Sequence, residues 1–107
     1  NYRYKDILFI HGNKLVKTDA KTIILGHIHP SISLREGTRT ERFKCFLKGE
    51  YKDKTIIVMP AFTLLKGGMD VLNQESTSPY VKDAYDFEVY VVGDKIYNFG
   101  KAKNLKN

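Results

Sequence analysis

Short apolar runs separated by polar turns are the main pattern of this chain. Asp6–Ile10, Thr22–Leu25 and Thr55–Met59 are continuous apolar runs, which predicts strands that are buried on both faces. Other segments alternate or pair across short turns and predict further strands: Ser31–Leu34, Phe43–Leu47, Phe87–Val92 and Lys95–Phe99. The Gly93–Asp94 step between the last two predicts a hairpin.

The segments between these runs predict loops and no long helix. Lys14–Lys21 is polar and has room for one helical turn, and Arg35–Arg42 is a charged loop around Gly37. Gly67-Gly68 marks a flexible loop within 64–69, and 70–79 is irregular. The lysine-rich tail from Gly100 has no acidic residue, and we expect it to be frayed.

The three histidines of the chain all follow predicted strands. His11 comes directly after the first apolar run, and His27 and His29 come after the second, within Gly26-His27-Ile28-His29-Pro30. On an extended backbone, residues at i and i+2 share a face, and neighbouring strands would bring all three imidazoles to one sheet edge. Converging neutral imidazoles predict a metal site. The competing interpretation is that they are ordinary turn histidines.

Composition narrows the class of protein. The 107 residues fit one domain or part of one, and no apolar run is long enough to span a membrane. The single cysteine, Cys45, excludes an internal disulfide and fits a reducing cytoplasm. Its place within Phe43-Lys44-Cys45-Phe46 favours a strand residue over a nucleophile. The net charge of +6 favours anionic partners, although a solvated basic surface explains it equally well. The chain opens directly before a core strand, so we expect it to be a piece of a larger protein.

Several motifs together resemble the calcineurin-like metallophosphoesterases. His11-Gly12 and Gly26-His27-Ile28-His29-Pro30 resemble the last two motifs of that superfamily. Further segments resemble an archaeal subgroup related to the SbcD nucleases: Met59-Pro60-Ala61-Phe62, Gly67-Gly68 with Asp70-Val71-Leu72-Asn73, and Ser78-Pro79-Tyr80. The resemblance covers nearly the whole chain. It implies an α/β fold, in which residues 1–107 form the strand-rich C-terminal half of a four-layer β-sandwich flanked by helices.

The resemblance also implies a site with two divalent metal ions. His29 would bind the first ion, and His11 and His27 the second. Such paired ions clamp the attacking and leaving oxygens of a phosphate ester. Nitrogen-rich ligation suits manganese, iron, zinc or nickel better than magnesium, and manganese is our expectation.

The early motifs of the superfamily do not occur in this chain. They read Asp-x-His, Gly-Asp-x-x-Asp and Gly-Asn-His-Asp, and they supply the carboxylate ligands and the leaving-group acid. Many members also read His-Gly-His where this chain has His11-Gly12-Asn13. The catalytic residues are therefore expected in a missing N-terminal half, and the fragment alone is expected to be inactive.

Three functions remain open from the sequence. The first is metal-dependent hydrolysis of a phosphodiester or phosphomonoester, nucleic acid included, completed by the missing half or by another copy of the chain. The second is a DNA- or RNA-binding piece, and the third is a non-catalytic assembly fragment with structural histidines. The second draws on a basic segment with interleaved aromatic residues: Arg35, Arg39, Arg42, Phe43, Lys44, Lys48, Tyr51, Lys52 and Lys54.

Overall fold

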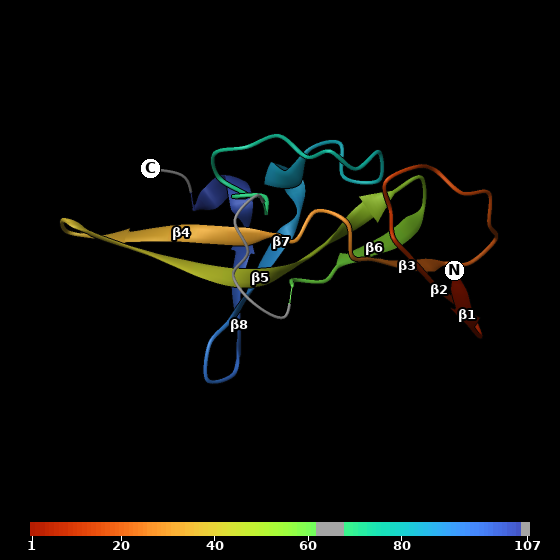
Figure 1. Cartoon of the computed structure of the whole chain (residues 1–107), viewed down its shortest axis with the longest axis horizontal. Coiled ribbons are helices and arrows are strands. Elements are labelled where there is room, and N and C mark those ends of the chain that lie inside the picture. The colour runs from red at the N-terminus through yellow and green to blue at the C-terminus, as the bar shows by residue number, and fades with distance from the viewer. Residues whose placement is uncertain (62–67, 106–107) are drawn as a thin grey trace.

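A computed structural model shows one mixed β-sheet and describes residues 1–61 and 68–105 (Figure 1). The strand order is β1-β2-β3-β6-β5-β7-β8, and β4 pairs with β5 alone. The strands are β1 (Tyr2–Tyr4), β2 (Ile7–Ile10), β3 (Thr22–Leu25), β4 (Ser31–Glu36), β5 (Arg39–Tyr51), β6 (Lys54–Val58), β7 (Glu88–Val92) and β8 (Ile96–Lys101). Two 3-10 helices, η1 (Ala84–Asp86) and η2 (Ala102–Asn104), complete the described elements.

The predicted α/β fold with flanking helices is wrong for this chain. Its described residues form an all-β domain whose helical content is η1 and η2, and one mixed sheet replaces the expected sandwich. The reason is local, because no described segment carries an amphipathic period of 3.6 residues over several turns. Parallel neighbours β2 and β3 are joined by residues 11–21, which run as a loop where a helix is the usual connection.

The apolar runs form the strands that they predict, with small differences in length. β3 has the predicted bounds, and β2, β6, β7 and β8 begin or end within two residues of them. The charged segment 35–42 differs, because β4 and β5 extend through it to a tight turn at Gly37. The described part of the tail, residues 100–105, also differs from the expected frayed segment: it contains the end of β8 and η2, and Ala102 is fully buried. Phe62 and Gly67 of the predicted loop and motif lie outside the described residues.

The parallel strands alternate strictly between a core side and an open side. β2, β3 and β6 share one register, in which Leu8, Ile23 and Ile56 are neighbours and are buried. Phe9, Ile24 and Ile57 occupy the next register positions, point to the opposite face and are half-buried. The core therefore lies on one side of the sheet, and a second apolar surface remains on the other.

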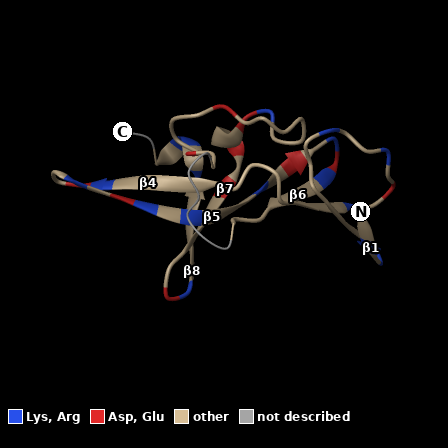
Figure 2. Ribbon diagram, viewed as in Figure 1, with Lys and Arg blue, Asp and Glu red and all other residues tan. Residues whose placement is uncertain are grey.

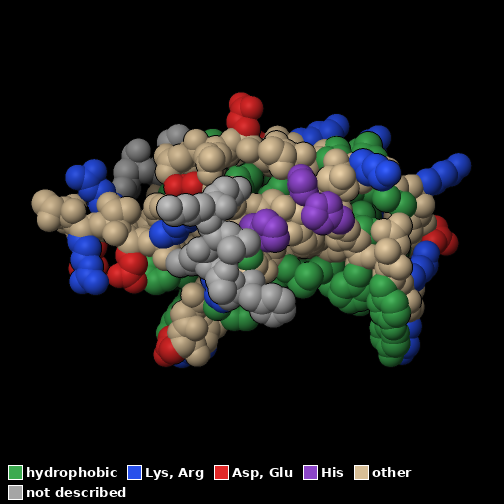
Figure 3. Space-filling model, in the orientation of Figure 1, with side chains coloured by type: hydrophobic (Ala, Val, Ile, Leu, Met, Phe, Trp, Pro, Cys, Tyr) green, Lys and Arg blue, Asp and Glu red, His purple; other side chains and the backbone are tan. Residues whose placement is uncertain are grey.

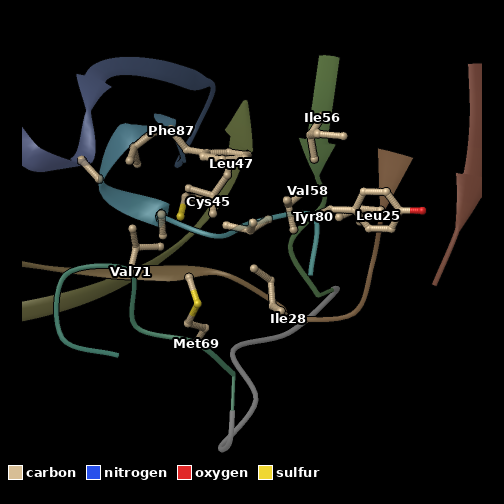
Figure 4. Packing of buried hydrophobic residues seen from close by; sticks show 14 of the residues in the cluster. Leu25, Ile28, Cys45, Leu47, Ile56, Val58, Met69, Val71, Tyr80 and Phe87 are labelled. Atoms are coloured by element: carbon tan, nitrogen blue, oxygen red, sulfur yellow. The ribbon is translucent and has the colours of Figure 1, made fainter. Parts of the chain in front are cut away.

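The chain between 69 and 87 covers the core side. It runs across the sheet without regular structure apart from η1, as the upper layer of Figure 1. Figure 4 shows its side chains interlocked with those of the strands, the labelled residues being Leu25, Ile28, Cys45, Leu47, Ile56, Val58, Met69, Val71, Tyr80 and Phe87. This layer also carries Thr77 and Ser78 to the ends of β2 and β3.

Candidate metal centre

His11 and His27 meet at the carboxyl ends of two parallel strands. β2 and β3 pair through Ile10 and Leu25, so the residues that follow them leave the sheet side by side. The amide of Gly26 donates to the carbonyl of His11 over 3.3 Å and continues that pairing past the strands. The Nε2 atom of His11 lies 2.9 Å from Nδ1 of His27, and the two rings meet edge to face. Figure 3 shows the histidine side chains on one face of the molecule.

Gly12 fixes the direction in which the chain leaves β2. Its φ of +95° is in the left-handed region, and a Cβ there would lie 2.9 Å from Cδ2 of Leu25. The hydroxyl of Ser78 donates to the Gly12 carbonyl over 2.6 Å, which ties the turn to the covering layer. The position of His11 therefore depends on a residue without a side chain and on a hydrogen bond to a distant segment.

Thr77 holds the other side of the His27 ring. Its Oγ1 lies 3.1 Å from Nε2 of His27. If Nε2 carries the proton and donates to Thr77, the lone pair of His27 is on Nδ1 and faces His11. Histidine ligands of metals usually donate their second ring nitrogen to a neighbouring acceptor in this way, which fixes the tautomer. Thr77 was not among the site residues predicted from the sequence, where only its neighbour Ser78 belonged to a quoted motif.

The surroundings of His27 favour its neutral form. Partial burial lowers the pKa of His27, and the positive charges that His11 and His29 would carry lower this pKa further. A neutral imidazole is the form that binds a metal ion. His29 is thus near enough to His27 to influence its charge.

The backbone at His29 differs from the extended one that was assumed when its ring was predicted to lie beside the other two. The chain bends at His27 and Ile28, and His29 has a left-handed φ of 46°, so the extended backbone assumed for the i, i+2 alternation is absent. The Nδ1 atom of His29 is buried and has no hydrogen-bond partner among the described residues. A buried ring nitrogen without a partner is costly unless a ligand satisfies it.

The spacing of the His11 and His27 nitrogens fits two ligands of one ion. Two nitrogens that each lie about 2.1 Å from one ion are about 3.0 Å apart at a right angle and about 3.4 Å apart in a tetrahedron. The 2.9 Å between His11 Nε2 and His27 Nδ1 is close to the first value. Across residues 1–61 and 68–105, however, no three His, Cys, Asp or Glu side chains gather as a ligand set. The two-ion site implied by the resemblance needs carboxylates that these residues do not bring to the histidines.

Cys45 is a strand residue, as predicted, and it belongs to the core. It lies in β5 and is fully buried. Burial, together with the nearby Asp70 charge, raises the pKa of its thiol to about 12. The thiolate that a nucleophile or a metal ligand requires is therefore disfavoured.

The basic segment from Arg35 to Lys54 is not one continuous patch. Arg39 stands near the tip of the long β4–β5 hairpin, and Lys54 begins β6 after the opposite end of β5 (Figure 2). Arg42 turns inward, and its Nε donates to the Ser31 hydroxyl over 2.8 Å. The interleaved charges are thus distributed along an elongated molecule 46 Å in length.

Comparisons with family models, with curated proteins and with solved structures gave no match to this chain. In the described part of the chain, no helix has the length and apolar character needed to cross a membrane.

Proposed function

We propose that this chain provides the histidine side of the metal site of a phosphoesterase. The observation that carries the proposal is the 2.9 Å approach of His11 Nε2 and His27 Nδ1 at the ends of parallel strands. Strand ends in such sheets are common ligand sites, since side chains from neighbouring strands converge there. The resemblance of His11-Gly12 and of the Gly26–Pro30 motif to the metallophosphoesterases supplies the reaction class.

The residues of this chain would bind and orient. His11 would ligate through Nε2 and His27 through Nδ1, and Thr77 would fix the His27 ring by accepting a hydrogen bond from Nε2. His29 would offer its buried Nδ1, which has no hydrogen-bond partner among the described residues, as a further metal ligand. Divalent ions, manganese in our proposal, polarise a phosphate ester and lower the pKa of water when bound.

The carboxylate ligands must come from elsewhere than the described residues. A further segment of a larger protein or a second chain would bring them, as the resemblance implies for the early motifs. The substrate would be a phosphodiester or a phosphomonoester, and hydrolysis would depend on that additional part. The isolated chain is therefore expected to bind metal and to hydrolyse very slowly.

The test of this proposal measures hydrolysis of bis(p-nitrophenyl) phosphate by the chain in its native assembly. We expect hydrolysis that requires manganese, stops on chelation and is lost in His27→Ala. Lys95→Ala, an exposed change in the β7–β8 turn, is the control and should leave the rate unchanged. Hydrolysis that continues in the chelator, or in His27→Ala, would contradict the proposal.

Titration of the isolated chain with manganese or zinc separates metal binding from catalysis. His11→Ala and His27→Ala should each weaken binding at least tenfold, because each removes one of the two converging nitrogens. His29→Asn preserves a side chain that tolerates a left-handed φ and should have a smaller effect. Equal losses in all three variants would contradict a site centred on the His11–His27 pair.

A further inference from the structure

A second site lies beside the starts of β3 and β6, away from the histidines at the ends of the strands. It is a hollow of about 410 Å³ between residues 15–18 of the loop that joins β2 to β3 and the turn between β5 and β6. Tyr51 and Tyr80 contribute aromatic rings that meet edge to face, with centroids 5.4 Å apart. Leu15 adds an apolar wall that is 52% exposed. The lining is thus largely apolar and partly aromatic.

The walls of this hollow are held in place by backbone contacts. The Tyr80 hydroxyl accepts a hydrogen bond from the Val16 amide over 2.7 Å, which anchors the loop between β2 and β3 to the aromatic pair. On the other side, Lys52 and Asp53 both have positive φ and form the two-residue β5–β6 turn. The hollow therefore has a formed shape without a ligand.

Its rim is cationic. Lys17, Lys52 and Lys54 line the hollow, and none of its lining residues is acidic. Within the described residues these three ammonium groups form no ion pair, and Lys54 donates instead to the Ala20 carbonyl over 2.6 Å. Figure 2 shows basic and acidic positions side by side around this end of β6, so the cationic character belongs to the lining of the hollow.

Two ammonium groups lie near the ring of Tyr51. The ammonium nitrogens of Lys52 and Lys82 lie 5.5 Å and 5.4 Å from the centroid of its ring. The neighbouring hollow past Tyr51 is mixed in charge, because Glu50, Asp83 and Asp86 line it together with Lys52 and Lys82. The purely cationic lining is therefore confined to the first hollow, where Lys17 and Lys52 are the exposed charges.

We propose that this hollow binds single-stranded nucleic acid, with a base against Tyr51 and Leu15 and phosphates at Lys17 and Lys52. Proteins that bind single strands without sequence preference combine aromatic stacking platforms with a cationic track for the backbone. The site uses neither the histidines nor a metal ion, so it goes beyond the proposed function and does not depend on it.

The test is fluorescence anisotropy with a labelled oligothymidylate of about 12 nucleotides, within the usual site size. The buffer contains a chelator, and salt is varied. We expect binding that persists in the chelator and in His27→Ala. Each phosphate contact with a single strand contributes about 0.7 to the slope of log affinity against log salt. The double variant Lys17→Ala/Lys52→Ala should therefore lower that slope by about 1.4.

Two comparisons distinguish binding at the hollow from attraction to the positive charge of the whole chain. Arg39→Ala/Lys95→Ala removes two exposed charges elsewhere on the surface and should leave affinity near that of the unaltered chain. Tyr51→Leu should weaken binding about tenfold through lost stacking, whereas Tyr51→Phe should preserve it.

Three results would overturn the proposal. They are no binding, equal losses in the two double variants, and affinity for a duplex equal to that for the single strand. Because both double variants change exposed side chains alone, misfolding of a Tyr51 variant would not prevent the decision.

Discussion

The Nε2 atom of His11 and the Nδ1 atom of His27 lie 2.9 Å apart, although 16 positions separate the two residues in the sequence. The parallel pairing of β2 with β3 brings them together, because Ile10 and Leu25 are register partners and the chain leaves both strands at the same edge. The remaining features of the site, Gly12, Thr77 and Ser78, act on the position of one ring or the other.

Thr77→Val tests whether the threonine hydroxyl orients His27. The change preserves size and removes Oγ1, which lies 3.1 Å from His27 Nε2. We expect zinc affinity, measured by titration calorimetry, to fall about 10- to 100-fold, as is usual for lost partners of metal-ligating histidines. Ser76→Ala, one residue away, should leave the affinity within about threefold, since the Ser76 hydroxyl bonds to Ser78 and not to a histidine. Unchanged affinity in Thr77→Val would show that the hydroxyl does not position the ring.

Gly12→Ala should destabilise the fold and disturb the site together. A left-handed φ costs an alanine about 1–2 kcal/mol, and the new Cβ would also meet Leu25 at 2.9 Å. Gly37→Ala is the matched control, because its φ is also positive but the space around its Cβ is open. The free energy of unfolding, measured in urea, should fall by about 2 kcal/mol or more in Gly12→Ala and by about 1 kcal/mol in Gly37→Ala. Equal losses would mean that the contact with Leu25 relaxes freely.

The lowered pKa of His27 predicts a stability that falls in acid. In the folded chain this pKa lies below its ordinary value, so the unfolded chain binds the proton more readily. The stability that comes with neutral His27 is fully present above the pKa of about 6.5 that the residue has in the unfolded chain. It is lost as the pH falls through the pKa that His27 has in the folded chain. The free energy of unfolding, measured in urea on the metal-free chain, should fall between pH 8 and pH 5. The fall should be smaller in His27→Gln than in the unaltered chain. An identical decrease in both would exclude His27 as a source of the acid sensitivity.

The thiol of Cys45 should react with Ellman's reagent in the unfolded chain alone. Burial and the Asp70 charge raise its pKa from 9.0 to about 12, which reduces the thiolate about a thousandfold. At neutral pH the native chain should therefore remain unlabelled over a time in which the chain in urea is fully labelled. Rapid labelling of the native chain would show that β5 opens readily or that the thiol is accessible.

The strands were predictable where burial dictated the residue type. Ile23 and Leu25 are fully buried, so their positions had to be apolar, and the sequence marks β3 at its true bounds. The β4–β5 hairpin was missed beyond Leu34 because its outer residues, Arg35 to Arg42, are largely in solvent on both faces. Such a ribbon is stabilised by its ladder and turn and carries no apolar pattern to detect. The flanking helices came from the resemblance, and no helical period in the described residues supports them.

The site was predictable in part for similar reasons. His11 and His27 could be paired because two buried strands followed by histidines predicted neighbours with a common edge. The left-handed backbone of His29 could not be predicted, since a histidine gives no local sign of it. Thr77 approaches from 50 positions along the chain, through a layer without a regular pattern, so only the folded structure reveals its contact.

The most direct test of the central claim is a long-range proton–nitrogen correlation spectrum of the histidine side chains, recorded before and after one equivalent of zinc. The account predicts that the nitrogen signals of His11 Nε2 and His27 Nδ1 move to metal-bound values. His27 Nε2 should remain protonated against Thr77. If zinc leaves both of these nitrogens unshifted, or binds His27 through Nε2, then the pair is not the metal centre proposed here.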